Sequence, residues 1–123
     1  MTKLPEGMNW YLAKLVYQIV TGEGRHMPQF DIQYRLIRAD DSDWALEKAH
    51  ILGKMGETSF ENVRNELVRW KFLAVEDVCR IAALDDGEQL YGQIVEPGDP
   101  GEYVALTRAR AQRILDEVRT FGE

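Results

Sequence analysis

The sequence predicts an α+β fold, a four-stranded antiparallel sheet with two helices on one face, in the order β-β-α-β-β-α. Three observations lead to this fold class. Residues 9–21 and 30–36 alternate in polarity with a period of two, which is typical of strands. Two other segments repeat apolar residues at helical spacing. Glycine, proline and aspartate separate these runs and supply the turns.

The size and composition of the chain suit one globular domain. It has 123 residues, of which 45% are hydrophobic and 29% charged, so it can build a core. We expect residues 1–123 to form a single domain and residues 1–8 to be a flexible tail. No apolar run approaches the ~20 residues that span a bilayer, and residues 1–8 have no apolar export signal, so we expect neither membrane insertion nor export.

The charge and the cysteine content exclude several classes of function. With 21 acidic and 15 basic residues the formal net charge is −6, which argues against nucleic acid or an anionic membrane as the main partner. The one cysteine, Cys79, excludes an internal disulfide and a zinc site built from several thiolates. A reducing, cytoplasmic location fits this composition best.

The first half of the chain predicts a hairpin followed by a helix. Between residues 9 and 21 one alternating set is wholly apolar, which favours a strand, although a helix there stays possible. Gly22, Gly24 and Pro28 then supply turn residues before the clear alternation of 30–36. The helix is expected to begin after a cluster of capping residues and to end at Gly53 or Gly56. The cluster consists of Asp40, Asp41, Ser42 and Asp43, and the apolar stripe of Trp44, Ala45, Ala49, Ile51, Leu52 and Met55.

The second half predicts two more strands and a second helix. Residues 67–75 alternate, and the strand continues toward Leu84 through a bulge near Glu76 and Asp77, where the alternation slips. Asp85-Asp86-Gly87 is typical of a type I′ turn, so residues 90–95 are expected to return as the fourth strand. The last helix opens either after Asp99, with Pro100 in its first turn, or later, with Thr107 as the cap. Its apolar face consists of Val104, Ala111, Ile114, Leu115 and Val118.

The strand patterns predict a basic sheet face opposite the helices. We expect the apolar set Tyr11, Leu15, Phe30, Ile32, Tyr34 and Leu36 to point toward the helices. Basic side chains then project together from the other face, next to tryptophan. The candidate ligand or interface residues are Trp10, Lys14, Arg35, Arg69, Trp70 and Lys71. This grouping depends on the strand register, because a shift of one residue moves a side chain to the other face.

No motif assigns a catalytic residue, a metal or a cofactor. Glu47 and His50 have the spacing found in di-iron bundles, but the sequence lacks a second such pair. The aspartates at 40–43 lack the glycine and glutamate of a calcium loop, and helix capping explains them better. Cys79 lies between Val78 and Arg80 in a predicted strand, next to further apolar residues, where a thiol is usually inert packing.

Several segments together resemble a known family. They are Asn9-Trp10-Tyr11-Leu12-Ala13-Lys14-Leu15, Gln29-Phe30-Asp31, the run from Leu36 to Asp40 leading into Trp44-Ala45-Leu46-Glu47-Lys48-Ala49, and Val68-Arg69-Trp70-Lys71-Phe72. The chain is similar, from about residue 9 to about residue 114, to a bacterial domain-of-unknown-function family, number 4288. The resemblance implies a small cytoplasmic bacterial protein and carries over no catalytic residue, cofactor or substrate.

Three hypotheses of function follow from these patterns. The first is a non-enzymatic interaction or regulatory module, a homodimer or the binder of another protein, that acts through its tryptophan and arginine residues. The second is a binding protein or an enzyme with a pocket for a small anion between the sheet and the last helix, using Arg35, Arg69 and Lys71. The third is an immunity-type inhibitor whose acidic residues 76–102 block a basic toxin.

Overall fold

The computed structural model describes residues 8–120, so most of the predicted tail at residues 1–8 lies outside the described residues. The chain divides into two compact units, Met1–Tyr91 and Gly92–Glu123, which are described separately below. That residues 1–123 form a single domain stays a prediction. We call the first unit the sheet unit and the second the helical unit.

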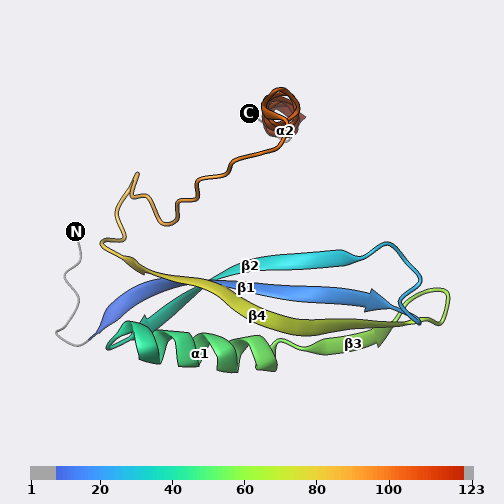
Figure 1. Cartoon of the computed structure of the whole chain (residues 1–123), viewed down its shortest axis with the longest axis horizontal. Helices are drawn as coiled ribbons and strands as arrows, with labels where there is room; N and C mark the ends of the chain where they lie inside the picture. Colours follow the sequence, from blue (N-terminus) through green and yellow to red (C-terminus); the bar gives the residue numbers. More distant parts are fainter. Residues whose placement is uncertain (1–7, 121–123) are drawn as a thin grey trace. The chain divides into compact units, whose positions relative to one another are not determined.

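The sheet unit is built around a long central hairpin. Strand β1 (Asn9–Thr21) pairs antiparallel with β2 (Gln29–Ala39) on one side and with β4 (Leu67–Ile81) on the other, and β3 (Thr58–Glu61) pairs with β4. The strand order is β2-β1-β4-β3. Helix α1 (Ser42–Met55) lies along one face of this sheet (Figure 1). We call that face the helix face and the opposite one the open face.

The α+β class and the order β-β-α-β-β-α are confirmed. One strand differs: the strand expected at residues 90–95 is absent, and β3, which was not expected, is present. Residues 90–95 form no strand, although the turn before them exists, with Gly87 at φ 83° and the Glu88 N–H donating to Asp85 O. Instead Thr58–Glu61 pairs with residues 67–70 of β4. The side chain of Asn62 accepts two backbone N–H bonds in the connecting turn, which fixes this short hairpin.

The residues of β2 that project from each face of the sheet also differ from the prediction. We call this alternation the phase of β2. Leu12 pairs with Leu36 and Val16 with Ile32, so the apolar set Phe30, Ile32, Tyr34 and Leu36 projects from the open face, where these side chains are 47–54% exposed. The expectation that they point toward the helices is therefore wrong. Directly opposite residues of an antiparallel pair share a face. On the helix face the buried residues of β1 meet Asp31, Gln33, Arg35 and Ile37.

Small residues let α1 approach the sheet closely. Ala45, Ala49 and Gly53 are its buried positions, spaced four apart on one side of the helix. A Cβ atom at Gly53 would overlap the ring of Phe72. The phenol of the fully buried Tyr17 donates to Gly53 O at 2.8 Å. The helix begins as expected, with Asp41 as its N-cap, and ends at Gly56.

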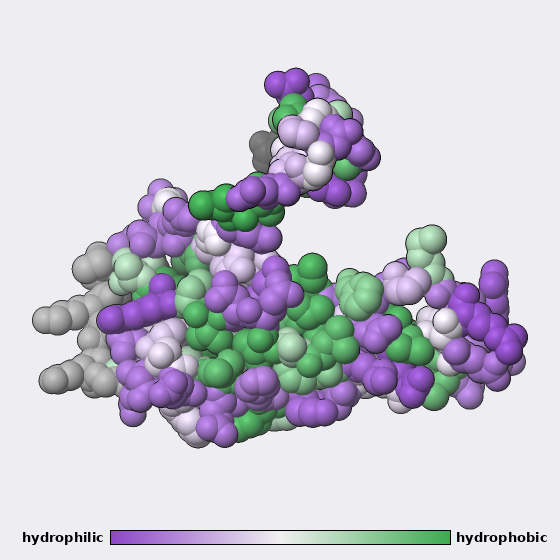
Figure 2. Space-filling model, viewed as in Figure 1, coloured by the Kyte–Doolittle hydropathy of each residue, from purple (hydrophilic) through white to green (hydrophobic). Residues whose placement is uncertain are grey.

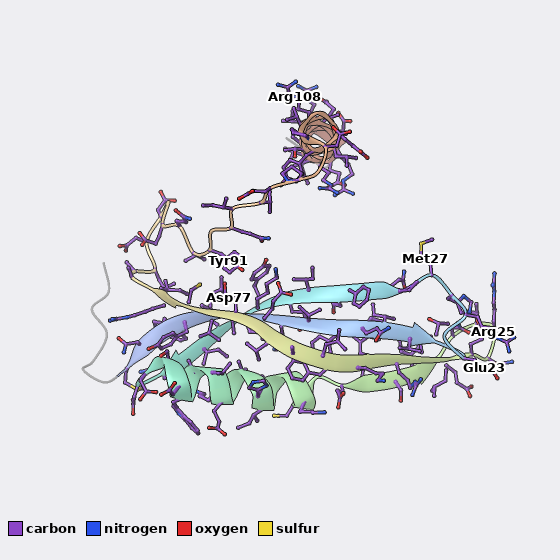
Figure 3. The ribbon with its side chains drawn as sticks, viewed as in Figure 1. Glu23, Arg25, Met27, Asp77, Tyr91 and Arg108 are labelled. Carbon is purple, nitrogen blue, oxygen red and sulfur yellow. The ribbon has the colours of Figure 1, made fainter. Side chains whose placement is uncertain are left out.

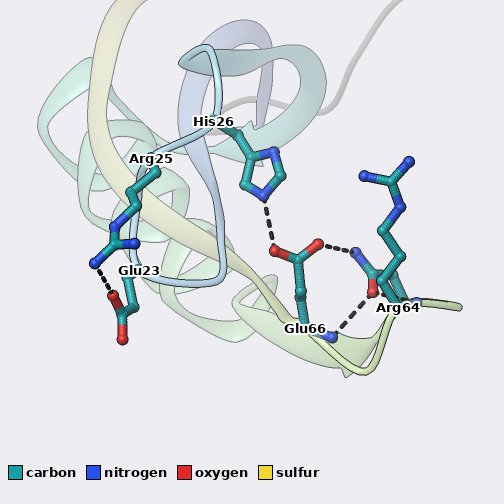
Figure 4. Close-up of polar contacts among 6 residues, drawn as sticks. Glu23, Arg25, His26, Arg64 and Glu66 are labelled. Atoms are coloured by element: carbon teal, nitrogen blue, oxygen red, sulfur yellow. Dashed lines mark hydrogen bonds and ion pairs between the residues drawn. The ribbon is translucent and has the colours of Figure 1, made fainter.

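The far end of the hairpin is joined by a polar contact between two loops. His26 Nε2 lies 2.8 Å from Glu66 Oε2 and so connects the β1–β2 loop with the β3–β4 turn (Figure 4). Asn62 Nδ2 donates to the other oxygen of the same carboxylate at 3.3 Å. The hydrogen bond from His26, followed by that from Asn62, lowers the pKa of Glu66 below its ordinary value.

The helical unit contains helix α2 (Pro100–Thr120). Of the two starts that the sequence left open, the earlier one is observed: Asp99 Oδ1 accepts the Glu102 N–H at 3.0 Å, and Pro100 occupies the first helical position. Several apolar side chains of α2 are about half exposed, namely Tyr103, Val104, Leu106, Ile114, Leu115 and Val118. The expected placement of α2 on the sheet stays a prediction.

Candidate interaction site

The six candidate residues do not share one face of the sheet. Lys14, Arg69 and Lys71 project from the open face, because Arg69 pairs with Val20 and Lys71 with Gln18. Arg35 pairs with the fully buried Ala13 and therefore lies on the helix face. The prediction that Arg35 joins the other cations is wrong for the same reason as the phase of β2. An anion pocket formed by Arg35, Arg69 and Lys71 together is excluded by this register.

Lys14 is committed to an ion pair on the open face. Its ammonium nitrogen lies 2.8 Å from Glu76 Oε1, and Lys14 is only 7% exposed. Glu76 is the extra residue of the predicted bulge, since Asp77 pairs with Lys14 and Val75 with Leu15. The bond from Glu76 raises the pKa of Lys14, against the lowering effect of burial. Lys14 is thus a structural cation rather than a free anion ligand.

Tyr91 completes this cluster above Lys14. Its ring contacts that of Tyr34 at a centroid distance of 5.0 Å, and its hydroxyl donates to Asp77 Oδ2 at 3.2 Å (Figure 3). Burial, followed by the bond to Asp77, raises the pKa of Tyr91. Residues that the sequence assigned to a returning strand therefore cover part of the open face with a side chain instead.

A second polar arrangement lies on the helix face of β2. Asp31 Oδ2 accepts hydrogen bonds from Gln33 Nε2 at 2.7 Å and from the indole of Trp70 at 3.1 Å. Arg35 Nε donates to Gln33 Oε1 at 3.1 Å. This row satisfies half-buried polar groups along the strand, and it accounts for Arg35 and Trp70 as structural residues.

Arg69, Trp70 and Lys71 line one shallow hollow at the start of β3. Its volume is about 310 Å³, and the rest of its lining is Glu57, Thr58 and Ser59. One carboxylate oxygen of Glu57 accepts the Phe72 N–H at 3.0 Å. The negative charge of Glu57 opposes an anion in this hollow. These three candidates therefore line the same hollow but do not form an anion-binding site.

A larger, apolar hollow lies between one side of α1 and the end of the β1–β2 pair. Its volume is about 460 Å³. We call it the Trp10–Trp44 groove, and its lining consists of Trp10, Leu36, Ile37, Arg38, Trp44, Lys48, Ile51 and Leu52. In Figure 2 apolar side chains gather over the middle of the sheet unit, while the end that carries the 22–28 loop is polar.

The helix and the strands both contribute to the Trp10–Trp44 groove for local reasons. Positions 44, 48, 51 and 52 of α1 repeat at helical spacing, next to the buried stripe of small residues. The predicted apolar stripe is therefore shared: Ala45 and Ala49 pack in the core, and Trp44 and Ile51 face the groove about half exposed. Trp10 is the second residue of β1 and pairs with Arg38 near the end of β2.

Two cations border this apolar surface. The guanidinium carbon of Arg38 lies 5.7 Å from the ring centroid of Trp10, which is cation–π geometry. Lys48 Nζ donates to the backbone oxygen of Arg38 at 2.5 Å, which holds its ammonium group at the lining. The groove therefore combines two indole rings with two positive groups.

Of the residues that line the groove, Trp10 alone belongs to the six candidates predicted from the sequence. The signal for the others was present: Trp44 directly follows the capping cluster, and Lys48 and Ile51 lie four and seven residues later. A helix side with that spacing is next to the core side, and Arg38 is the penultimate residue of β2, the strand that leads into the helix. Trp44, Ile51 and Leu52 were predicted as part of the apolar helix stripe, without a groove beside it.

Other chemistry is limited in the described part of the chain. Burial raises the pKa of the Cys79 thiol, whose sulfur lies 3.8 Å from Leu12 O. Within residues 8–120 there is no cluster of three histidine, cysteine or acidic side chains that could hold a metal ion. In the same range no helix has the length and apolar character needed to cross a membrane.

The acidic stretch of residues 76–102 is divided between the two units. Glu76 binds Lys14, Asp77 accepts the Tyr91 hydroxyl, and Asp99 caps α2. Several of its charges therefore have intramolecular roles, which weakens the case for an acidic surface directed at a basic toxin.

The comparisons with known proteins identify a family and nothing more specific. Residues 10–92 match the family model described as Domain of unknown function (DUF4288). Apart from Asn9, the match covers the described strands and α1, and it includes every residue that lines the Trp10–Trp44 groove. No match was found among curated proteins or among solved structures.

Proposed function

We propose a role for this chain, which belongs to the family described as Domain of unknown function (DUF4288), as a small interaction module. It binds a protein partner in the Trp10–Trp44 groove. The observation that carries this proposal is the combination of two tryptophans, an arginine and a lysine around one apolar hollow of about 460 Å³. Tryptophan and arginine are the residue types most enriched among the energetic centres of protein interfaces.

The shape of the groove favours a protein partner over an enclosed small molecule. Leu36, Trp44 and Ile51 are each about half exposed, so a ligand in the groove keeps one side in solvent. Small-molecule sites usually bury most of the ligand surface. An apolar side chain presented by a folded or extended partner needs only such a shallow apolar surface.

The charges around the groove define the chemistry of the partner. Arg38 and Lys48 favour a carboxylate next to the apolar anchor, because opposite charges complement each other across an interface. We therefore propose a segment with an aromatic or large aliphatic residue flanked by aspartate or glutamate. The chain itself is acidic, with a net charge of −6, so these two cations give it local selectivity for such a segment.

The cytoplasm is the compartment that we propose for this interaction. The chain has one cysteine, Cys79, which is half buried in the sheet unit and has no second cysteine with which to form an internal disulfide. A regulatory role through binding needs no reactive group, which agrees with the absence of a catalytic motif in the sequence.

A displayed library of short random peptides, selected on the immobilised full-length chain, tests this role. We expect enriched peptides to combine an aromatic or aliphatic residue with neighbouring acidic residues. Arg38→Glu and Trp44→Ala are each expected to weaken the selected peptides at least roughly tenfold. Arg69→Glu is the matched control, because it reverses a cation that lies on the open face, outside the groove.

Two results would overturn the proposed role. Enrichment of peptides without acidic residues would remove the assigned partner chemistry. An equal loss of affinity in the Arg69→Glu control would show that net charge, and not the groove, determines binding.

A further inference from the structure

The outer edge of β2 is a long strand edge without a neighbouring strand in the described sheet unit. In the described sheet β2 has one neighbour, β1, and it runs for eleven residues without a proline. An exposed edge presents a row of backbone N–H and C=O groups that can pair with another chain. Proteins that stay monomeric usually block such an edge with charges, bulges or a short strand.

The charges on β2 are arranged so that they attract a second copy of the same strand. In an antiparallel pair of identical strands related by a two-fold axis normal to the sheet, opposite residues lie symmetrically about the axis. An axis through Gln33 places Asp31 of one copy opposite Arg35 of the other, and the reverse pair forms by symmetry. Both residues lie on the helix face, where Gln33 connects their side chains within one copy.

The same axis matches the apolar residues of the open face. Phe30 falls opposite Leu36, and Ile32 opposite Tyr34. Each of these four side chains is about half exposed. Cross-strand pairs of aromatic and aliphatic residues stabilise antiparallel sheets.

Neighbouring registers lose this complementarity. An axis through Tyr34 places Arg35 opposite Gln33, and an axis through Ile32 places Asp31 opposite Gln33. In neither case do the acidic and basic residues meet. One register therefore satisfies the charges and the apolar residues together.

We propose that the chain forms a homodimer in which the β2 edges of two copies pair antiparallel about Gln33 and join the two sheets into one. The contact is isologous, so it closes after two copies and leaves no free β2 edge for further growth. The pairing of residues 29–37 includes Leu36 and Ile37, which also line the Trp10–Trp44 groove. The dimer is nevertheless tested separately from the groove, because Asp31 and Arg35, whose charges are exchanged below, lie outside that lining.

Exchange of charges at Asp31 and Arg35 tests the dimer by sedimentation velocity at roughly 100 µM. The wild-type chain is expected to sediment at twice its mass of 14.2 kDa. Asp31→Arg places arginine opposite Arg35, and Arg35→Asp places aspartate opposite Asp31, so each single variant is expected to be monomeric. An equimolar mixture of the two variants is expected to form a heterodimer, because every opposite pair is again an arginine with an aspartate.

Controls keep the test decisive. Arg69→Asp changes the same net charge on another strand and is expected to leave the dimer intact. If Asp31→Arg fails to fold, because Asp31 accepts bonds from Gln33 and Trp70, hydrogen exchange of the wild-type chain decides: β2 amides become better protected as concentration rises. A wild-type monomer, single variants that stay dimeric, or β2 protection that does not change with concentration would each overturn the proposal.

Discussion

The ammonium nitrogen of Lys14 lies 2.8 Å from Glu76 Oε1, and a bulge in β4 makes this contact possible. The bulge leaves Glu76 without a direct partner on β1, so its side chain is free to reach toward the cation. A lysine in the middle of a central strand would otherwise lose its hydration without compensation. The bulge at Glu76 thus supplies the counter-ion for the nearly buried ammonium group of Lys14.

The ion pair predicts a loss of stability at high pH. The folded state raises the pKa of Lys14 above its ordinary value of 10.5, so the folded state holds this proton more tightly. The contribution is complete below pH 10.5 and disappears as pH rises through the raised pKa. Urea unfolding between neutral pH and pH 11.5 is expected to show wild type and Glu76→Gln converging at the alkaline end. Glu23→Gln is the control, because the partner of Glu23 is the permanently charged Arg25. A constant difference between wild type and Glu76→Gln would contradict the assignment.

Gly53 is predicted to be intolerant of a single methyl group. Alanine is ordinarily the better helix former, by about 1 kcal/mol. Here its Cβ atom would overlap the ring of Phe72. Overpacking therefore outweighs the gain in helix propensity and makes the substitution destabilising. We expect Gly53→Ala to lower the free energy of unfolding by about 1–3 kcal/mol in urea. Gly98→Ala, whose Cβ would meet no atom within 4 Å, is expected to change it by no more than about 0.5 kcal/mol. Stabilisation by Gly53→Ala would show that α1 lies farther from the sheet.

The hydroxyl of Tyr17 is predicted to stabilise the contact between the sheet and α1. Tyr17→Phe keeps the buried ring and removes only the hydrogen bond to Gly53 O. Gly53 O still accepts the Gly56 N–H at 3.2 Å, so the loss should be moderate, about 0.5–1.5 kcal/mol. Tyr103→Phe in α2 is the matched exposed substitution. Equal effects of both variants on thermal unfolding would show that the hydrogen bond from Tyr17 to Gly53 O does not contribute to stability.

How far the fold could be predicted differs between strands. The alternation in β1, the capping aspartate of α1 and the bulge at Glu76 follow from local patterns, and the structure contains all three. The phase of β2 could not be predicted, because alternation identifies a strand but not which of its faces meets the core. Here the polar side faces α1, and Asp31 finds partners there in Gln33 and Trp70.

The strand expected at residues 90–95 was predicted wrongly for a different reason. The Asp-Gly turn after residue 84 is real, but a turn does not secure a returning strand when the following segment makes other contacts. Tyr91 packs its ring on Tyr34 and bonds to Asp77, which places this one residue over the open face. Of the groove, the sequence indicated Trp10 alone, because its other residues come from a helix side and a strand end that meet only in the fold.

The contact between His26 and Glu66 predicts a response to acid. The bond from His26 lowers the pKa of Glu66 below its ordinary value of 4.5, so its contribution to stability is present above pH 4.5 and is lost as pH falls through the lowered pKa. A carboxyl NMR titration is expected to place the midpoint of Glu66 below 4.5. His26→Ala is expected to move this midpoint upward. An unchanged midpoint in His26→Ala would contradict the contact between the two loops.

The indole N–H signals of the three tryptophans test the binding role of the Trp10–Trp44 groove most directly. Trp10 and Trp44 line the groove, whereas Trp70 bonds to Asp31 elsewhere in the sheet unit and serves as an internal control. During titration of the labelled chain with an acidic, aromatic peptide from the selection, we expect the Trp10 and Trp44 signals to shift together and the Trp70 signal to stay in place. A shift confined to Trp70, or saturable binding that leaves Trp10 and Trp44 unmoved, would contradict the account.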